Sequence, residues 1–269
     1  MQHRRSQFLR GTEAAQRPSL PYSGVPIGLA DNRTSGNLCR PKGYSRAADA
    51  FEPPPRSCLS VHTGEQYHHI FMSSRRDLAV RDRFQRIAFG LLGKEDAILD
   101  FGAGTGIDAK AYAARGHRTF VYEPADAMRE HLDIYCREEI AGGTVIKLGA
   151  ELGCKVQAVT ANFAVLNHFA DHTALFAQLA GVVDKGGFVL ASMLNPYYLG
   201  DARYGWWRKN LVNLVRDGRY AFDTESGVHR FAPGAVVRAA APHFRLERLL
   251  PRGLGMASHL YMFLLFRRV

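Results

Sequence analysis

The sequence predicts an α/β fold: a doubly wound, mostly parallel seven-stranded sheet with helices on both faces. Three observations predict it. Short apolar segments alternate with helical ones between residues 73 and 194, a glycine-rich turn follows the first apolar segment, and two apolar segments separated by a loop end the chain. Strands that alternate with helices form right-handed crossover units, which make the strands parallel and cover both faces of the sheet. The last two segments, 244–250 and 258–266, are expected to form a terminal antiparallel hairpin.

The expected elements follow in chain order. An amphipathic helix begins after a capping Ser73 and ends at Gly93. The apolar segments that follow are expected to be strands, at residues 97–101, 119–123, 144–148, 156–163 and 188–194. The segments between and after them are expected to be helices, at 105–116, 124–139, 172–183, from about Ala202, and at 233–241. Such folds bind ligands at the carboxyl ends of their strands, where the strand order reverses.

Composition divides the chain into a tail and one domain. Residues 1–60 hold seven of the twelve prolines and half of the net charge of +10, and they have no helical or strand period. We interpret them as a disordered basic tail; an arm that binds RNA or an acidic surface, or a transit peptide, are the alternatives. Residues 61–269 are expected to form the folded domain, in which 195–230 would be a cap over the substrate.

Several protein classes are excluded at this stage. The four cysteines are scattered, without a C-x-x-C pair or paired histidines, so neither a zinc site nor a disulfide framework is indicated. The sequence contains no apolar stretch of membrane-spanning length, and its basic N-terminal segment lacks the apolar core of a secretory signal. We therefore expect a cytoplasmic protein that does not bind membranes.

The glycine-rich turn carries the chemistry. A strand ends in Asp100 and leads directly into Gly102, Gly104 and Gly106 before a helix. Glycines allow a tight turn and let a ligand lie against bare backbone, where N–H groups at the helix start point outward. Dinucleotide-binding enzymes use G-x-G-x-x-G or A, but the third small position is Ile107 here. The dinucleotide pattern therefore does not fit.

The acidic residue two positions before the first glycine, together with the G-x-G-x-G spacing, resembles the first motif of class I, Rossmann-like S-adenosylmethionine-dependent methyltransferases. The resemblance covers roughly residues 61–269, with its motifs between 98 and 128 and between 150 and 169. It implies that S-adenosyl-L-methionine is the cofactor. The residues implied to bind this cofactor are Tyr67, Asp100, Gly102, Ala103, Gly104, Thr105, Gly106, Glu123, Pro124, Met128, Ala150, Glu151, Asn162 and Phe163.

The resemblance also implies a role for each part of the site. Glu123 ends the second strand and would accept the hydroxyl hydrogens of the ribose, while Met128 would contact the adenine. The loop with Ala150 and Glu151 would lie beside the adenine amine. Asp100 would reach the ammonium of the methionine part; its alternative role is to cap the next helix.

The same resemblance places Asn162 and Phe163 at the methionine end of the cofactor, and it places His168 toward the methyl acceptor. Methyl transfer needs mainly the alignment of donor and acceptor, with a base only where the acceptor must lose a proton. His168 is the candidate base, although a lone histidine is often structural. His172 could pair with it as a metal ligand, but no convincing third ligand is present, so no metal is expected.

An aromatic stretch after the fifth strand suggests how an acceptor is recognised. Its candidate substrate residues are Tyr197, Tyr204, Trp206 and Trp207. Such rings could stack a flat or apolar acceptor, or they could pack between helices as core. We expect a small-molecule acceptor. RNA or protein methylation and a non-methylating Rossmann-type nucleotide binder are the alternatives, and nucleic acid is disfavoured because the obvious basic charge lies in a tail without interleaved aromatics.

Overall fold

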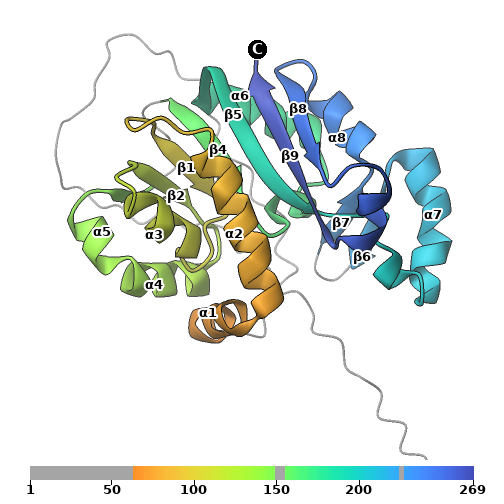
Figure 1. Ribbon diagram of the computed structural model, residues 1–269, viewed down its shortest axis with the longest axis horizontal. Helices are drawn as coiled ribbons and strands as arrows, with labels where there is room; N and C mark the ends of the chain where they lie inside the picture. Colours follow the sequence, from red (N-terminus) through yellow and green to blue (C-terminus); the bar gives the residue numbers. More distant parts are fainter. Residues whose placement is uncertain (1–62, 149–154, 224–226) are drawn as a thin grey trace, which may run out of the picture.

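The computed structural model describes residues 63–148, 155–223 and 227–269 (Figure 1). The expected tail, residues 1–60, and the expected adenine-binding residues Ala150 and Glu151 lie outside the described residues. Within the described part of the chain, no helix is both long and apolar enough to cross a bilayer.

The main sheet has seven strands in the order β3-β2-β1-β4-β5-β9-β8. Its strands are β1 (Ile98–Phe101), β2 (Thr119–Tyr122), β3 (Val145–Lys147), β4 (Val156–Ala161), β5 (Val183–Leu194), β8 (Phe244–Leu250) and β9 (Tyr261–Arg268). Strands β1 to β5 pair in parallel, and β9 pairs antiparallel with both β5 and β8. The doubly wound fold and the terminal hairpin predicted from the sequence are confirmed.

The strand order reverses beside β1. The chain builds β2 and β3 on one side of β1 and then returns to place β4 on the other side. A reversal of this kind separates the two connections that leave the sheet at the carboxyl ends of β1 and β4, and it opens a crevice between them. The loops that follow β1 and β4 are therefore the structural basis of a ligand site.

Helices cover both faces of the sheet. On one face lie α2 (Arg75–Phe89) and α3 (Ile107–Ala113), where Phe84 of α2 packs with Ile98 of β1. On the other face lie α6 (His172–Val182) and α8 (Pro233–Ala240), where Phe176 of α6 packs with Leu99. Ile98 and Leu99 are successive residues, so their side chains point to opposite faces. Figure 1 shows α2 crossing in front of the sheet.

The N-terminal helix was not expected. α1 (Gly64–Ser73) begins with a capping box in which the Thr63 hydroxyl accepts from the Gln66 N–H, and the Gln66 side chain accepts from the Thr63 N–H. The next helix is capped by Ser74 rather than by Ser73, because the Ser74 hydroxyl accepts from the Asp77 N–H at 3.3 Å. That helix ends at Phe89, before the Gly93 predicted from the sequence.

The remaining differences are local. The helix expected over 124–139 is broken into α4 (Asp126–Tyr135) and α5 (Arg137–Ala141), with the buried Cys136 at the break. The segment 195–230 contains more than the single helix expected. Its elements are η2 (Leu199–Asp201), α7 (Gly205–Asp217), β6 (Arg219–Asp223) and β7 (Val228–Phe231). The two strands form a separate antiparallel sheet. Short 3₁₀ turns, η1 (Val165–His168) and η3 (Gly253–Ser258), complete the described elements.

Candidate active site

The glycine turn, residues 102–106, leaves the carboxyl end of β1 with open backbone. Gly102, Gly104 and Gly106 have φ of 76°, 56° and 85°, a left-handed conformation that glycine adopts without steric cost. The N–H of Gly102 donates to the Tyr122 carbonyl at 2.7 Å, which holds the turn against β2. A Cβ at Gly104 would meet only the Tyr67 ring, at 3.9 Å. The backbone at Gly104 can therefore be approached closely by a ligand.

Glu123 lies beside this turn, at the end of β2. Its Oε2 accepts from the N–H of Gly104 and its Oε1 accepts from the N–H of Ala125, each at 2.8 Å. The side chain is buried. The next residues predicted for the site lie close by, since Pro124 follows Glu123 directly and Met128 is buried with Tyr67 and Ala125 in one apolar cluster.

A cavity of about 20 Å³, hereafter the cleft, lies over the turn. It is lined by backbone and side chains of Gly102 to Thr105 and by Tyr67, Arg81, Asp100, Ile107, Asp108, Asn162 and Phe163. The structure thus brings together Tyr67, Asp100, Asn162, Phe163 and most of the turn, as the sequence predicted. The volume is on the order of one water molecule, and Tyr67 is the residue of α1 among those that line it.

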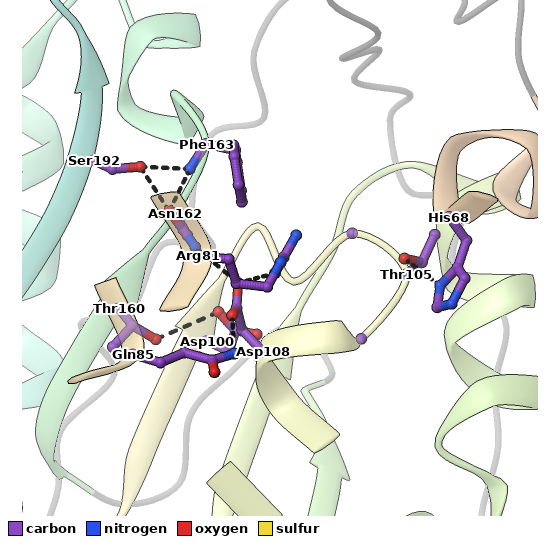
Figure 2. Close-up of polar contacts among 12 residues, drawn as sticks. His68, Arg81, Gln85, Asp100, Thr105, Asp108, Thr160, Asn162, Phe163 and Ser192 are labelled. Carbon is purple, nitrogen blue, oxygen red and sulfur yellow. Dashed lines mark hydrogen bonds and ion pairs between the residues drawn. The ribbon is translucent and has the colours of Figure 1, made fainter. Parts of the chain in front are cut away.

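A buried polar network forms one wall of the cleft (Figure 2). Asp108 of α3 accepts from the Arg81 guanidinium, from Gln85 Nε2 at 2.7 Å and from Asn162 Nδ2 at 3.0 Å. The Arg81 guanidinium also lies 4.7 Å from the centre of the Phe163 ring. A buried charge costs several kcal/mol unless it is paired, so Asp108 accounts for the position of Arg81 at this depth.

Asp100 is the incompletely paired member of the wall. Its Oδ1 accepts from Thr160 Oγ1 at 3.4 Å, whereas Oδ2 is buried and has no hydrogen-bond partner among the described residues. Burial, with the neighbouring Asp108 charge, raises the pKa of Asp100 well above its ordinary value, although Arg81 opposes the shift. The alternative role as a helix cap is excluded, because the N-cap of α3 is Gly106 and no side chain bonds to it. Asp100 therefore lines the cleft with an acceptor that a bound cation can use.

The loop after β4 is held in an unusual conformation. Phe163 and Ala164 have φ of 54° and 66°, which costs non-glycine residues on the order of 1–3 kcal/mol each. The Phe163 N–H donates to Asn162 Oδ1 at 2.9 Å and to Ser192 Oγ at 2.6 Å, and the Ser192 hydroxyl donates to Asn162 Oδ1 at 2.7 Å. These bonds fix the Phe163 ring against the cleft.

Aromatic rings close the cleft on the side of α1. Tyr67 stacks on Phe71 with centroids 4.4 Å apart, Phe71 meets Phe163 edge-on at 4.9 Å, and Phe163 meets Tyr261 edge-on at 5.5 Å. All four rings are buried. Burial raises the pKa values of the Tyr67 and Tyr261 phenols, so both stay protonated at neutral pH and cannot serve as bases there.

Comparison with known proteins decides the family. Residues 72–230 match the family model described as "Methyltransferase domain", which is more than half of the chain. The chain belongs to this methyltransferase family. No curated protein matches it significantly.

Solved structures show the same fold for this methyltransferase domain. The CcbJ methyltransferase from Streptomyces caelestis has a TM-score of 0.52 and 17% identity, over 70% of this chain and 94% of CcbJ. The PH0226 protein from Pyrococcus horikoshii OT3 has a TM-score of 0.52 and 13% identity, over 76% of this chain and 98% of that protein. Magnesium protoporphyrin IX methyltransferase (ChlM) from Synechocystis PCC 6803, solved with bound SAH, has a TM-score of 0.50 and 17% identity, over 73% and 88% of the two chains. The class I methyltransferase fold predicted from the sequence is confirmed.

The two histidines singled out in the sequence occupy different surroundings in the methyltransferase domain. His168 is buried at the end of η1 and does not line the cleft, so its role as a base stays a prediction. His172 Nε2 lies 2.9 Å from the Leu166 carbonyl, and its ring packs 4.0 Å from that of Phe231. Burial lowers the pKa of His172 to about 4, so it is neutral and packed as core. Across the described ranges, no three His, Cys, Asp or Glu residues gather as a metal site.

The aromatic stretch forms its own packing unit within the 195–230 insert. Trp207 Nε1 donates to the Pro196 carbonyl at 3.0 Å, and Tyr204 stacks on Trp206 at 6.1 Å. The buried Arg230 lies over Trp206 at 5.6 Å and pairs with Asp201 at 2.8 Å. Tyr197 is 40% exposed. None of Tyr197, Tyr204, Trp206 and Trp207 lines the cleft, and their role toward an acceptor stays a prediction.

Sequence reasoning missed Arg81, Gln85 and Asp108, which build the polar wall. One signal for them was present. Arg81 and Gln85 lie four residues apart, and Arg81 lies three before Phe84, so one turn of α2 carries a cation beside the apolar stripe that faces the sheet. A charged residue at a core-facing position of a helix indicates a buried partner, but the sequence does not name that partner.

Proposed function

We propose that the protein is an S-adenosylmethionine-dependent methyltransferase that transfers a methyl group to a small-molecule acceptor by in-line displacement. One observation carries the proposal. Beside the open backbone of Gly104, a single cleft holds a carboxylate oxygen without a hydrogen-bond partner, on Asp100, and a buried guanidinium, on Arg81. With Asp100 ionised, this pair would complement the ammonium and carboxylate of an α-amino acid, which is the methionine part of the cofactor.

The residues present fit this cofactor. Asp100 would accept from the ammonium, and the guanidinium donors of Arg81 that do not bond to Asp108 would bind the carboxylate. Glu123 would bind the ribose hydroxyls, at the position where it also holds Gly104 and Ala125. Pro124 and Met128 would lie along the adenine. Ala150 and Glu151 would reach the adenine amine, as the family resemblance implies.

The chain's own contribution to catalysis is alignment and the exclusion of water. When bound, S-adenosylmethionine supplies a methyl group already activated by a positively charged sulfur. Tyr67, Phe71, Phe163 and Tyr261 would surround the reacting atoms with apolar surface, and Asn162 holds Phe163 in place. Such fixed geometry accounts for most of the rate in an in-line transfer. If the acceptor must lose a proton, His168 is the candidate base.

Two further observations support a small-molecule acceptor. The apolar cluster beside the cleft, which holds the rings of Tyr67, Phe71, Phe163 and Tyr261, suits an apolar or flat acceptor better than a phosphate backbone. The structural neighbours CcbJ and ChlM are named as methyltransferases, and the ChlM name gives a porphyrin as its substrate. We place Tyr197, Tyr204, Trp206 and Trp207, in a cap formed by 195–230, among the residues that would select the acceptor.

The test is transfer of labelled methyl groups. The full-length protein is incubated with methyl-labelled S-adenosylmethionine and, separately, with a metabolite extract, total RNA and a protein extract. Label is expected in small molecules, and the Asp100→Asn variant should lose it. Label in RNA or protein alone would contradict the small-molecule acceptor. Binding of a nicotinamide dinucleotide, with no binding of S-adenosylhomocysteine, would contradict the methyltransferase activity itself.

A further inference from the structure

Helix α1 blocks the way into the cleft. Tyr67 of α1 is buried over the glycine turn. A Cβ placed on Gly104 would contact the Tyr67 ring. The cleft beneath it has a volume of about 20 Å³. The amino-acid part of the proposed cofactor alone is larger than this volume, so we infer that Tyr67 and the helix that carries it, α1, move when such a ligand enters.

A seam of two histidines holds α1 on its neighbours. His68 Nδ1 lies 3.1 Å from Thr105 Oγ1 in the glycine turn, as Figure 2 shows. On its other side the His68 ring packs against α4, with centroids 4.8 Å from His131 and 4.4 Å from Tyr135. The His131 ring also stacks on Tyr135 at 6.4 Å. His68 therefore touches both the turn and the helix that follows Glu123.

The seam is close-fitting at the start of α1. A Cβ at Gly64 would lie 2.4 Å from the Ala127 carbonyl oxygen and 2.6 Å from His131 Cβ. Gly64 is buried, and its φ is not in the left-handed region. This glycine is needed for close approach of α1 to α4 and not for its backbone conformation.

The charges that face His68 disfavour its protonation. Arg81 of α2 and His131 of α4 face His68, while Tyr135 and Thr105 contribute neutral groups. Lys110 of α3 lies 4.9 Å from the Tyr135 ring and adds another cation nearby. Within the described ranges, no carboxylate forms an ion pair with either histidine. Burial first, and then His131 and Arg81, lower the pKa of His68 below its ordinary value.

We propose that α1 is the gate of the cofactor cleft and that His68, packed between the glycine turn and His131, is its latch, closed when the His68 ring is neutral and released when it is protonated. The identity of the ligand admitted rests on the function proposed above, but the gate itself does not. The pKa of His68 is lower in the closed state than in the open state, so closure is complete above the ordinary histidine pKa of about 6.5 and is lost as the pH falls below it.

Hydrogen exchange of the ligand-free, full-length protein tests the latch directly. Exchange of the backbone amides of residues 67–73 is compared at pH 7.5 and pH 5.5, after correction for the intrinsic pH dependence and relative to β4 as an internal standard. We expect relative exchange to be faster at pH 5.5 in the wild type, by at least about threefold, because protonation of His68 favours the open state. The His69→Gln control, at an exposed position of the same helix, should respond as the wild type does.

Two variants make the test decisive. In the His68→Gln/His131→Gln double variant, relative exchange should be independent of pH, while Gly64→Ala should exchange fast at both pH values because α1 cannot seat on α4. An unchanged pH response in the double variant, equal exchange at both pH values in the wild type, or full protection in Gly64→Ala would overturn the proposal. Titration with S-adenosylhomocysteine at pH 7.5 separates the gate from the proposed function. A wild type that does not bind S-adenosylhomocysteine would refute the proposed function. The hydrogen-exchange result tests the gate alone.

Discussion

The carboxylate of Glu123 binds the glycine turn at its most open residue, since Oε2 accepts from the Gly104 N–H at 2.8 Å. The end of β2 therefore fixes the shape of the turn at the end of β1. In the proposed function the same carboxylate binds the ribose, so one buried side chain would join the two halves of the site.

Replacement of Glu123 by alanine should weaken cofactor binding. The variant loses two bonds to backbone N–H groups and the proposed bonds to the ribose, and hydrogen bonds to a charged group contribute about 1.5–3 kcal/mol. We expect the dissociation constant of S-adenosylhomocysteine to rise at least tenfold in calorimetric titration. Glu130→Ala, at an exposed position on α4, is the control and should bind normally. Equal affinities in the two variants would show that Glu123 is not part of the site.

Glycine replacements can separate backbone strain from ligand contact. Gly104 and Gly116 both have positive φ, and an alanine in this conformation costs about 1–2 kcal/mol. A Cβ at Gly116 meets nothing within 4 Å, whereas one at Gly104 projects toward the cleft. Both alanine variants should therefore lose similar stability in urea, but only Gly104→Ala should lose affinity for S-adenosylhomocysteine. Equal affinity losses would indicate a general effect of strain.

Asp100 should show opposite effects on stability and binding. Burial raises its pKa, so the folded state holds this proton at pH values where the unfolded state has lost it. The contribution to stability is fully present below the ordinary Asp pKa of about 3.9 and falls as the pH rises above it. Asp100→Asn removes this dependence. At pH 7 and without ligand, we expect a Tm at or above that of the wild type, together with at least tenfold weaker binding of S-adenosylhomocysteine. A clear loss of Tm would refute this account of Asp100.

Arg81 should discriminate between ligands with and without an amino acid. Arg81→Lys keeps a cation beside Asp108 but loses the fork that binds a carboxylate at two points. Affinity for S-adenosylhomocysteine should fall about tenfold, whereas affinity for 5′-methylthioadenosine, which lacks the amino acid part, should stay within about twofold. A parallel loss for both ligands would mean that Arg81 acts through the fold of the cleft and not through the carboxylate.

The features that depend on local sequence pattern were predicted from the sequence. The apolar strands and the glycine spacing gave the parallel sheet, the turn and the position of Glu123, because each follows from periodicity or from a residue type that a turn requires. The β6–β7 hairpin was not predicted. Its local signal is Gly218, which ends α7 with φ of 69° and is followed directly by β6.

The polar wall shows why part of the site could not be predicted. The Arg81–Asp108 pair joins residues 27 apart, and Asn162 reaches Asp108 across 54 residues. Such contacts depend on how α2 crosses the sheet and how β4 lies beside β1, which the sequence pattern does not encode locally. The segment around Tyr67 was placed at the cofactor by the family resemblance, but its helical conformation, α1, was not expected.

The most direct test of the central claim is calorimetric titration of the full-length wild type with S-adenosylhomocysteine and, in parallel, with a nicotinamide dinucleotide. We predict saturable binding of one S-adenosylhomocysteine per chain, lost in Gly104→Ala, and no binding of the dinucleotide. Binding of the dinucleotide alone, or S-adenosylhomocysteine binding that is unaffected by Gly104→Ala, would contradict a cofactor site built on this turn.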